Sequence, residues 1–179
     1  MIKAAQVLNI PIYITTQNAA RLGSTVSELT SLLAAADLSS ATATATTEVD
    51  KTAFSMLVPG LTEQLEAAPS GPASAGKKMS VIIVGIETHI CVTQTALDLL
   101  AGGHRVYILA DGVSSCNAGE RPVALSRLAR EGCTVTTSES LLYEVLGDAK
   151  DRNFKAIAGL VKDTKEDTKD AVETLCSRL

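Results

Sequence analysis

The run Val-Ile-Ile-Val at residues 81–84 constrains the fold of this chain more than any other stretch. Every side chain in it is apolar, and Gly85 ends it. A short apolar run bounded by glycine is typical of a strand that is buried on both faces. Residues 89–101 then carry apolar side chains at helical spacing and end at Gly102-Gly103. A buried strand that leads directly into a helix predicts a parallel sheet, because parallel strands are joined by helical crossovers.

The same alternation recurs along the chain. Thr25-x-x-Glu28 has the spacing of a capping box, and Pro59 suits the first turn of a helix. We predict strands at 11–16, 43–49, 81–85, 105–110 and 133–137. We predict helices at 1–10, 25–36, 59–67, 89–101, 120–131, 138–146, 153–162 and 166–177, with loops at 17–25, 68–79 and 111–120. Strands that alternate with helices predict one α/β domain with a mostly parallel sheet covered on both faces.

The composition excludes several classes of function. The 179 residues fit one domain and carry a net charge of −4, with three tyrosines, two phenylalanines and no tryptophan. Such a chain lacks both the basic patch and the aromatic platforms that bind nucleic acid. No apolar run reaches membrane-spanning length, and no basic stretch followed by an apolar one opens the sequence. We therefore expect no nucleic-acid partner, no membrane partner and no secretion.

The cysteines and histidines indicate neither a disulfide framework nor a metal site. The four cysteines show no Cys-x-x-Cys spacing, which favours reduced thiols in an intracellular, cytoplasmic compartment. His89 and His104 are the only histidines, and neither has a second histidine or a cysteine cluster at ligand spacing. We expect no protein-held metal and no cofactor.

Several predicted loops meet at one edge of the predicted sheet. In open parallel sheets, ligands bind beyond the carboxyl ends of the strands. Gln17 follows the first predicted strand, Lys51 the second, and residues 85–91 the third, while Asp111 follows the next strand along the chain. We predict that Asp111 caps a loop. The edge that carries Lys51 and Cys91 is the predicted functional site.

Cys91 lies in the first turn of the helix predicted at 89–101. A helix N-terminus presents free N–H groups and positive dipole, which favour a thiolate. The alternative is an inert packing cysteine, the commoner use of a free thiol. Lys51 would stabilise the thiolate if it approached the sulfur. Its alternative is a solvated lysine in an acidic neighbourhood, after Glu48 and Asp50.

The stretches VIIVGIETHICVTQTALDLL and VDKTAFSM resemble the motifs of the isochorismatase-like cysteine hydrolase superfamily, and most closely its isochorismatase domain-containing proteins. The cysteine motif of that family falls on Gly85, Thr88, Cys91 and Val92, and the lysine motif falls on residues 51–56. Further stretches that agree are ITTQ (14–17), RLGSTVSEL (21–29), LADGVSS (109–115) and TTSESLLYEVLGDA (136–149). The resemblance covers residues 1–162.

This resemblance implies a three-layer Rossmann-like fold and an Asp–Lys–Cys triad. Cys91 would attack an amide or related carbonyl carbon, and Lys51 would stabilise charge near the thiolate. The family has a cis peptide four residues before the cysteine, which falls here between Ile86 and Glu87. The backbone N–H groups of Glu87 and Cys91 would then form the oxyanion hole.

The resemblance also implies three substrate-binding residues, Gln17, Phe54 and Thr88. The alternative for Gln17 is an ordinary loop glutamine, and the alternative for Phe54 is a core aromatic. No cofactor is implied, and the partner is a small-molecule substrate.

One element of the family pattern has no counterpart in the sequence. In relatives, a first strand that ends in an aspartate precedes the segment that opens this chain. Asp37 and Asp50 are the only aspartates before Lys51, and neither follows a predicted strand in the right place. We therefore expect the sheet to lack its first strand, with exposed edges and apolar surface. We also expect slow acylation unless Glu87 supplies the missing carboxylate.

The prediction is a metal-free cysteine hydrolase that acts on a small carbonyl, amide or ureido substrate. One alternative is a catalytically impaired member that serves as an oligomeric binding or interaction protein. Another is a nucleotide-binding Rossmann domain, but this sequence has no GxGxxG motif.

We expect a hydrolase domain at 1–162, a charged helical tail at 163–179 with a solvated face, and a homo-oligomer by resemblance. The tripeptide Ser177-Arg178-Leu179 is similar to the Ser-Lys-Leu peroxisomal address, which predicts a peroxisome-type organelle as an alternative location.

Overall fold

The computed structural model describes residues 1–37, 47–67 and 78–176. The chain divides into two compact units: the first combines Met1–Ala53 with Leu142–Asp163, and the second combines Phe54–Leu141 with Thr164–Leu179. The strands of both units pair in parallel. This confirms the predicted α/β class with parallel sheets. The predicted domain boundary between residues 162 and 163 stays a prediction.

Two short strands form the sheet of the first unit. β1 (Thr15–Gln17) and β2 (Val49–Lys51) pair in parallel, and their register places Gln17 opposite Lys51. The helices of this unit are α1 (Ile2–Leu8), α2 (Ala19–Leu22), α3 (Ser27–Asp37), the second half of α7 (Ser138–Leu146) and α8 (Phe154–Asp163). A small apolar core from α1, α7 and α8 consists of Ala4, Leu142, Leu146 and Ile157.

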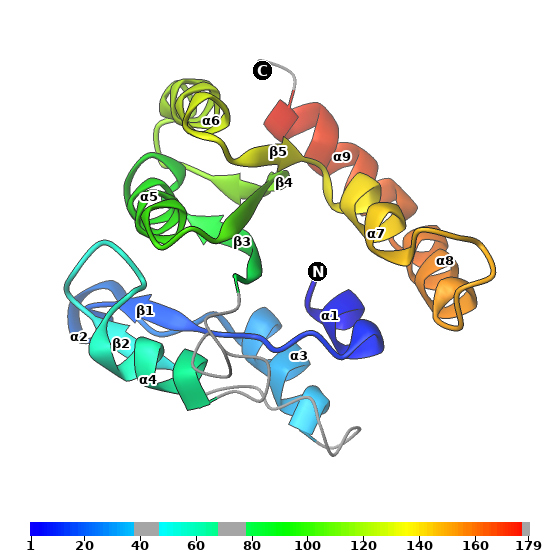
Figure 1. Ribbon diagram of the computed structural model, residues 1–179, viewed down its shortest axis with the longest axis horizontal. Helices are drawn as coiled ribbons and strands as arrows, with labels where there is room; N and C mark the ends of the chain where they lie inside the picture. Colours follow the sequence, from blue (N-terminus) through cyan, green and yellow to red (C-terminus); the bar gives the residue numbers. More distant parts are fainter. Residues whose placement is uncertain (38–46, 68–77, 177–179) are drawn as a thin grey trace. The chain divides into compact units, whose positions relative to one another are not determined.

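Three strands form the sheet of the second unit, in the order β3-β4-β5. They are β3 (Ser80–Ile86), β4 (Arg105–Ser114) and β5 (Thr134–Thr136). The helical elements of this unit are α4 (Pro59–Ala67), the π-helical turn η2 (Thr88–Val92), α5 (Thr93–Ala101), α6 (Glu120–Glu131) and α9 (Lys165–Cys176). Helices α5 and α6 lie on one side of the sheet and α9 on the other, so this unit by itself has three layers (Figure 1).

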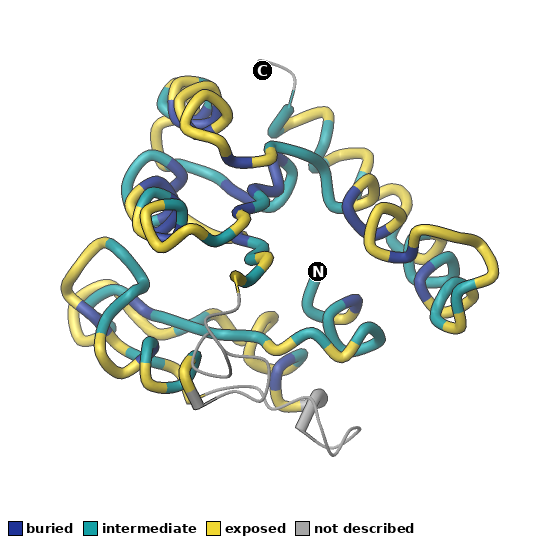
Figure 2. The backbone as a smooth tube through the Cα atoms, in the orientation of Figure 1, coloured by how far each residue is buried: buried dark blue, intermediate teal, exposed yellow. Residues whose placement is uncertain are grey.

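The core of the second unit is centred on β4, the middle strand of its sheet. The buried stretches in Figure 2 include β4 and the sheet-facing sides of α5 and α6. The buried cluster consists of Ile83, Val92, Ala96, Leu99, Val106, Ile108, Ala110, Val113, Leu125, Leu128 and Cys133. Burying a side chain of the size of leucine contributes about 1.5–3 kcal/mol. This apolar packing fixes β3 at Ile83 and the turn η2 at Val92, on either side of the segment that joins them.

Most predicted helices are confirmed. Those at 59–67, 120–131 and 138–146 have the predicted bounds, as α4, α6 and α7. The helix predicted at 89–101 is also present, although its first turn, η2, has π rather than α geometry. The helix predicted within the charged tail is α9, and it packs against β4.

The loop predicted at 17–25 is wrong in part, because it contains the short helix α2. The carboxylate of Asp50 accepts a hydrogen bond from the backbone N–H of Ala19, the first residue of α2, at 3.0 Å. This partner lies 31 residues away in the chain, so no local pattern could indicate it. The predicted capping box is not formed either, since the hydroxyl of Thr25 donates to the carboxylate of Glu48 at 2.5 Å.

The strand predicted at 105–110 is longer than the sequence indicated. β4 continues through Asp111-Gly112 to Ser114, a stretch that was predicted as a loop. After a shift in register between Ile83 and Gly85, the two strands resume pairing at Gly85 with Val113. An Asp-Gly pair is typical of a turn, but here the glycine serves a close approach: a Cβ atom on Gly112 would lie 2.9 Å from Val84 Cγ1.

The expected exposed edge is found at β3. Among the residues that the structure describes, β3 pairs only with β4, so its other edge carries no strand. Val84 and Ile86 are large apolar side chains with 45% and 68% of their surface exposed. The predicted strand at 43–49 and the predicted loop at 68–79 lie partly outside the described residues, and the tripeptide 177–179 lies wholly outside them. None of the described helices is long and apolar enough to cross a membrane.

Candidate active site

Cys91 lies in η2, directly beyond the carboxyl end of β3. Gly85 has φ of 121°, a conformation that favours glycine, and the peptide bond between Ile86 and Glu87 is cis. This confirms the expected place of the cis peptide, four residues before the cysteine. The N–H of Val92 donates to the carbonyl oxygen of Glu87 at 3.2 Å, which closes the wide π turn around Cys91. The Cys91 residue itself is partly exposed.

The segment that leads into this turn, residues 87–89, is bonded to residues 114–116 at the end of β4. The three contacts are Cys116 N–H to the Glu87 carboxylate at 2.6 Å, the Thr88 hydroxyl to Ser114 O at 2.8 Å, and His89 Nδ1 with the Ser115 hydroxyl at 3.0 Å. Consecutive residues of one loop are thus fixed to consecutive residues of another. No local pattern in the sequence indicates these contacts, because they join segments 26–29 residues apart.

These contacts bear on two sequence-predicted residues. The Glu87 carboxylate, which could have replaced the missing triad aspartate, is bonded to a backbone N–H of the β4 loop. Thr88 is completely buried and donates its hydroxyl to a backbone carbonyl, so the structure gives it a part in holding the loop. A substrate-binding role for Thr88 stays a prediction.

Lys51 and Gln17 lie together in the first unit, at the carboxyl ends of β2 and β1. Lys51 is only 7% exposed, so the alternative of a solvated lysine is wrong. Its Nζ donates to Gln17 Oε1 at 2.7 Å and to the carbonyl oxygen of Ala53 at 2.9 Å. The side-chain amide of Gln17 also donates to the carbonyl oxygen of Thr52 at 2.8 Å. Gln17 therefore bridges the lysine and the backbone that follows it, and it is more than an ordinary loop glutamine.

Asp50 is the aspartate nearest to Lys51 in the sequence. Its carboxylate accepts hydrogen bonds from Ala19 N–H and from the Thr16 hydroxyl, both at 3.0 Å. The bond from Ala19 is the main reason why the pKa of Asp50 lies below its usual value. These partners give Asp50 a structural part at the start of α2.

Phe54 and Met56 belong to the lysine motif but lie in the second unit. Phe54 is 50% exposed, so the alternative of a core aromatic is wrong. The backbone N–H of Met56 donates to the hydroxyl of Thr95 at 2.9 Å, and that hydroxyl donates to the carbonyl oxygen of Cys91 at 2.7 Å. Sequence reasoning missed Thr95, although its spacing of four residues from Cys91 places it one helical turn away.

The remaining cysteines differ from Cys91 in their surroundings. Burial, together with the charge of Glu131, raises the pKa of Cys133 to about 11. Burial likewise raises the pKa of Cys176, and Cys116 is exposed.

Asp111, predicted to cap a loop, accepts hydrogen bonds from the N–H and the hydroxyl of Ser138 at the start of α7. Within the described parts of the chain, no group of three or more His, Cys, Asp or Glu side chains is placed to hold a metal ion.

Parallel strands, helices that cover the sheet, and a candidate site beyond the strand ends define a Rossmann-like α/β protein. The sequence model of the isochorismatase domain matches residues 1–140. The chain belongs to the isochorismatase domain family.

Three relatives illustrate this membership. The secreted isochorismatase effector Isc1 of Phytophthora sojae is 40% identical over 91% of this chain and 71% of its own length. Isochorismatase domain-containing protein 2 of Xenopus laevis is 39% identical over 94% of this chain and 73% of its own. The solved structure of the MAR1 ribonuclease of Caenorhabditis elegans superposes with a TM-score of 0.72 at 33% identity, covering 89% of this chain and 73% of that one.

Proposed function

We propose that this protein is a metal-free cysteine hydrolase in which Cys91 attacks a small carbonyl, amide or ureido substrate. The observation that carries this proposal is the position of Cys91. It lies in a wide turn after a cis peptide at the end of a parallel strand, where such sheets bind ligands. The bonds that fix residues 87–89 to residues 114–116 support it, because a nucleophile must be held in place to react efficiently.

The chemistry follows from a thiolate beside backbone donors. The Cys91 sulfur forms a bond to the carbonyl carbon, and the carbonyl oxygen takes the negative charge. The N–H groups of Glu87 and Cys91 are proposed to bind that oxygen. The C–N bond then breaks, the amine leaves with a proton, and water cleaves the resulting thioester to release the acid and restore the thiol.

Lys51 is proposed to stabilise the thiolate, a role that rests on the lysine motif in the sequence. Its burial supports the proposal, because water screens the charge of a buried ammonium less than that of an exposed one. Gln17 and Phe54 are proposed to contribute to substrate binding.

The rate at which iodoacetamide alkylates Cys91, measured against pH, tests the proposal. The measurement uses the Cys116→Ser/Cys176→Ser background, in which the elevated pKa of Cys133 keeps that thiol unreactive near neutral pH. At pH 7 we expect Cys91 to react faster than the thiol of a short cysteine peptide, because a helix N-terminus favours the reactive thiolate. Lys51→Met, which keeps the volume but removes the charge, is expected to slow the reaction. A rate no faster than that of the peptide would overturn the proposal.

The alternative is an impaired member that acts as an oligomeric binding or interaction protein. The bond between the Glu87 carboxylate and Cys116 N–H favours this alternative, because it uses the carboxylate that lies within the cysteine motif. A reactive Cys91 combined with no turnover in a screen of amides, ureides and thioesters would support it. An RNA substrate belongs in the same screen, because the C. elegans relative is named as a ribonuclease. The net charge of −4 favours the small-molecule substrates.

The location is proposed to be intracellular, with a peroxisome-type organelle as the alternative that the tripeptide 177–179 indicates. The relative from P. sojae is named as a secreted protein, so both locations need a test. Fluorescent fusions at the N-terminus and at the C-terminus separate the possibilities. A punctate signal that only the N-terminal fusion shows would support import into a peroxisome-type organelle. That fusion leaves the tripeptide at the C-terminus, where the import receptor recognises it.

A further inference from the structure

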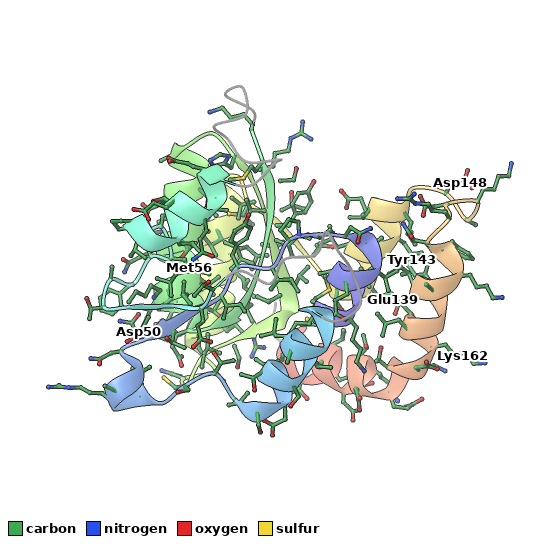
Figure 3. All side chains as sticks on the ribbon, turned by 90° about the horizontal axis from the view of Figure 1, so that it is seen from below. Asp50, Met56, Glu139, Tyr143, Asp148 and Lys162 are labelled. Carbon is green, nitrogen blue, oxygen red and sulfur yellow. The ribbon has the colours of Figure 1, made fainter. Side chains whose placement is uncertain are left out.

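Thr95 connects the two sequence motifs through one buried hydroxyl. It lies on α5, one turn after Cys91, and is 3% exposed. The hydroxyl donates to the Cys91 carbonyl oxygen at 2.7 Å and accepts the N–H of Met56 at 2.9 Å. Met56, labelled in Figure 3, is the last residue of the lysine motif at 51–56. The single proton of the hydroxyl and one of its lone pairs are therefore both used.

Only one of these two bonds is ordinary for a helical threonine. Threonine in a helix commonly donates to the carbonyl four residues earlier, as Thr95 does to Cys91. The bond from Met56 comes from a segment 39 residues away and attaches the lysine motif to α5. Without the hydroxyl, the half-buried N–H of Met56 would lose its acceptor. The lysine motif would then lose this hydrogen bond to α5.

Thr93 provides a natural contrast on the same helix. It is 5% exposed, and its hydroxyl donates to the carbonyl oxygen of Thr88 at 2.7 Å. That bond stays between α5 and the adjoining turn η2. A change at Thr93 thus removes a buried hydroxyl bond of similar length without touching the lysine motif.

We propose that Thr95 is a positioning residue of the cysteine site, whose hydroxyl holds the lysine motif in register with the turn of Cys91. This inference rests on the proposed function, because it assumes that Lys51 assists Cys91. The bonds of Thr95 are to the backbone of Met56 and of Cys91, and it acts through them.

The test is whether substitutions at Thr95 and Lys51 have coupled effects on the alkylation rate of Cys91. A merely structural role of Thr95 would not produce such coupling. Iodoacetamide alkylation of Cys91 at pH 7 is measured in the Cys116→Ser/Cys176→Ser background. We expect Thr95→Val to slow the reaction by about three- to tenfold, and Thr95→Ser, which keeps the hydroxyl, to restore it. The double variant Thr95→Val/Lys51→Met should be at most about twofold slower than the slower single variant, because both changes remove the same contribution.

The matched control is Thr93→Val. Its effect on alkylation should multiply with that of Lys51→Met, since Thr93 has no bond to the lysine motif. If the effects of Thr95→Val and Lys51→Met also multiply, the coupling is overturned while the proposed function stands. If Lys51→Met leaves alkylation unchanged, the proposed role of the lysine is wrong, and the coupling falls with it.

Amide hydrogen exchange of the unaltered protein provides a second readout that needs no variant to fold. The N–H of Met56 should exchange slowly, because Thr95 accepts it. Exchange at the rate of an unprotected amide would overturn the inference whatever the alkylation shows. In Thr95→Ser the protection should persist, and in Thr95→Val it should be lost.

Discussion

At the scale of single residues, the structure gives Gln17 a structural role. The resemblance implied a substrate-binding glutamine, a role that stays a prediction, and the observed amide joins the Lys51 ammonium to the backbone of Thr52. Burying an ammonium is costly unless oxygen atoms surround it. Gln17 therefore contributes to the stability of the first unit as well as to the candidate site.

We expect Gln17→Ala to lower the free energy of unfolding by about 1–3 kcal/mol, because a buried charged donor loses an acceptor. Urea denaturation measures this loss. Gln94→Ala provides the control, since Gln94 is an exposed glutamine on α5 and should change stability by less than about 0.5 kcal/mol. Equal effects of the two changes would contradict the bridging role of Gln17.

The lowered pKa of His104 predicts how the free energy of unfolding depends on pH. Burial, and to a lesser degree the charge of Lys78, lowers the pKa of His104 below its usual value, and its Nδ1 accepts the N–H of Met79 at 3.1 Å. The folded state then binds a proton less readily than the unfolded chain. The stability from neutral His104 is present above the unfolded pKa of about 6.5 and is lost as the pH falls through the folded pKa.

Thermal unfolding between pH 5 and pH 8, with His104→Asn as the reference, measures this contribution. The melting temperature of the unaltered protein should fall more steeply on acidification than that of the variant, because only the former has an imidazole to protonate. Parallel curves for the two proteins would show that His104 contributes nothing to the pH dependence.

Sequence reasoning at this scale succeeded where a motif fixes a position and failed where a partner is remote. Cys91 and the cis peptide at Ile86–Glu87 lie where the motif placed them. The burial of Lys51 depends on its contact with Gln17, 34 residues away in the chain, and its charge predicted the opposite. The role of Asp50 at α2 likewise depends on a contact that no local pattern encodes.

At the scale of elements, β4 shows why an Asp-Gly pair does not always end a strand. The sheet continues through Gly112 because β3 resumes its pairing at Gly85, and the missing side chain of Gly112 leaves room for Val84. The strand boundary was missed since it depends on a neighbouring strand rather than on β4 itself. Helices α4, α6 and α7 were predicted with their bounds because their apolar spacing and the residues that mark their ends, Pro59, Gly132 and Ser138, are local signals.

We expect Gly112→Ala to lower the free energy of unfolding by about 1–3 kcal/mol, the usual cost of an extra carbon in a packed place. The added Cβ would lie 2.9 Å from Val84 Cγ1 and 3.2 Å from Leu109 Cβ. Val84→Ala in the same chain should recover part of the loss, because it removes the nearer contact. Gly119→Ala is the control, since its Cβ meets only an Asn117 oxygen at 3.4 Å. No recovery in the double variant would contradict the steric explanation.

At the scale of the whole molecule, the homo-oligomer expected by resemblance stays a prediction, and exposed apolar side chains offer a place to test it. Leu22, Val26 and Leu29 lie close together in the sequence of the first unit, at the end of α2 and the start of α3, and are 73%, 57% and 44% exposed. Apolar side chains that form one contiguous exposed patch are commonly covered by another protein surface.

Light scattering on the purified protein is expected to give a mass that is a multiple of 18.6 kDa. Leu22→Asp/Val26→Asp should reduce that mass, because charges are unfavourable in an apolar interface. A monomer at all concentrations would show that these side chains are simply exposed to water. Val123→Asp, at an exposed apolar position on α6, tests whether any added charge has the same effect.

The two units alternate along the chain, and this has a consequence for how the protein can be divided. The first unit takes Met1–Ala53 and Leu142–Asp163, while the second takes Phe54–Leu141 and Thr164–Leu179. A single cut anywhere in the chain therefore leaves at least one unit split between the two fragments. Neither unit can be transplanted into another protein as one uninterrupted segment. Recombination that exchanges only one of them must join the chain at two or more points at once.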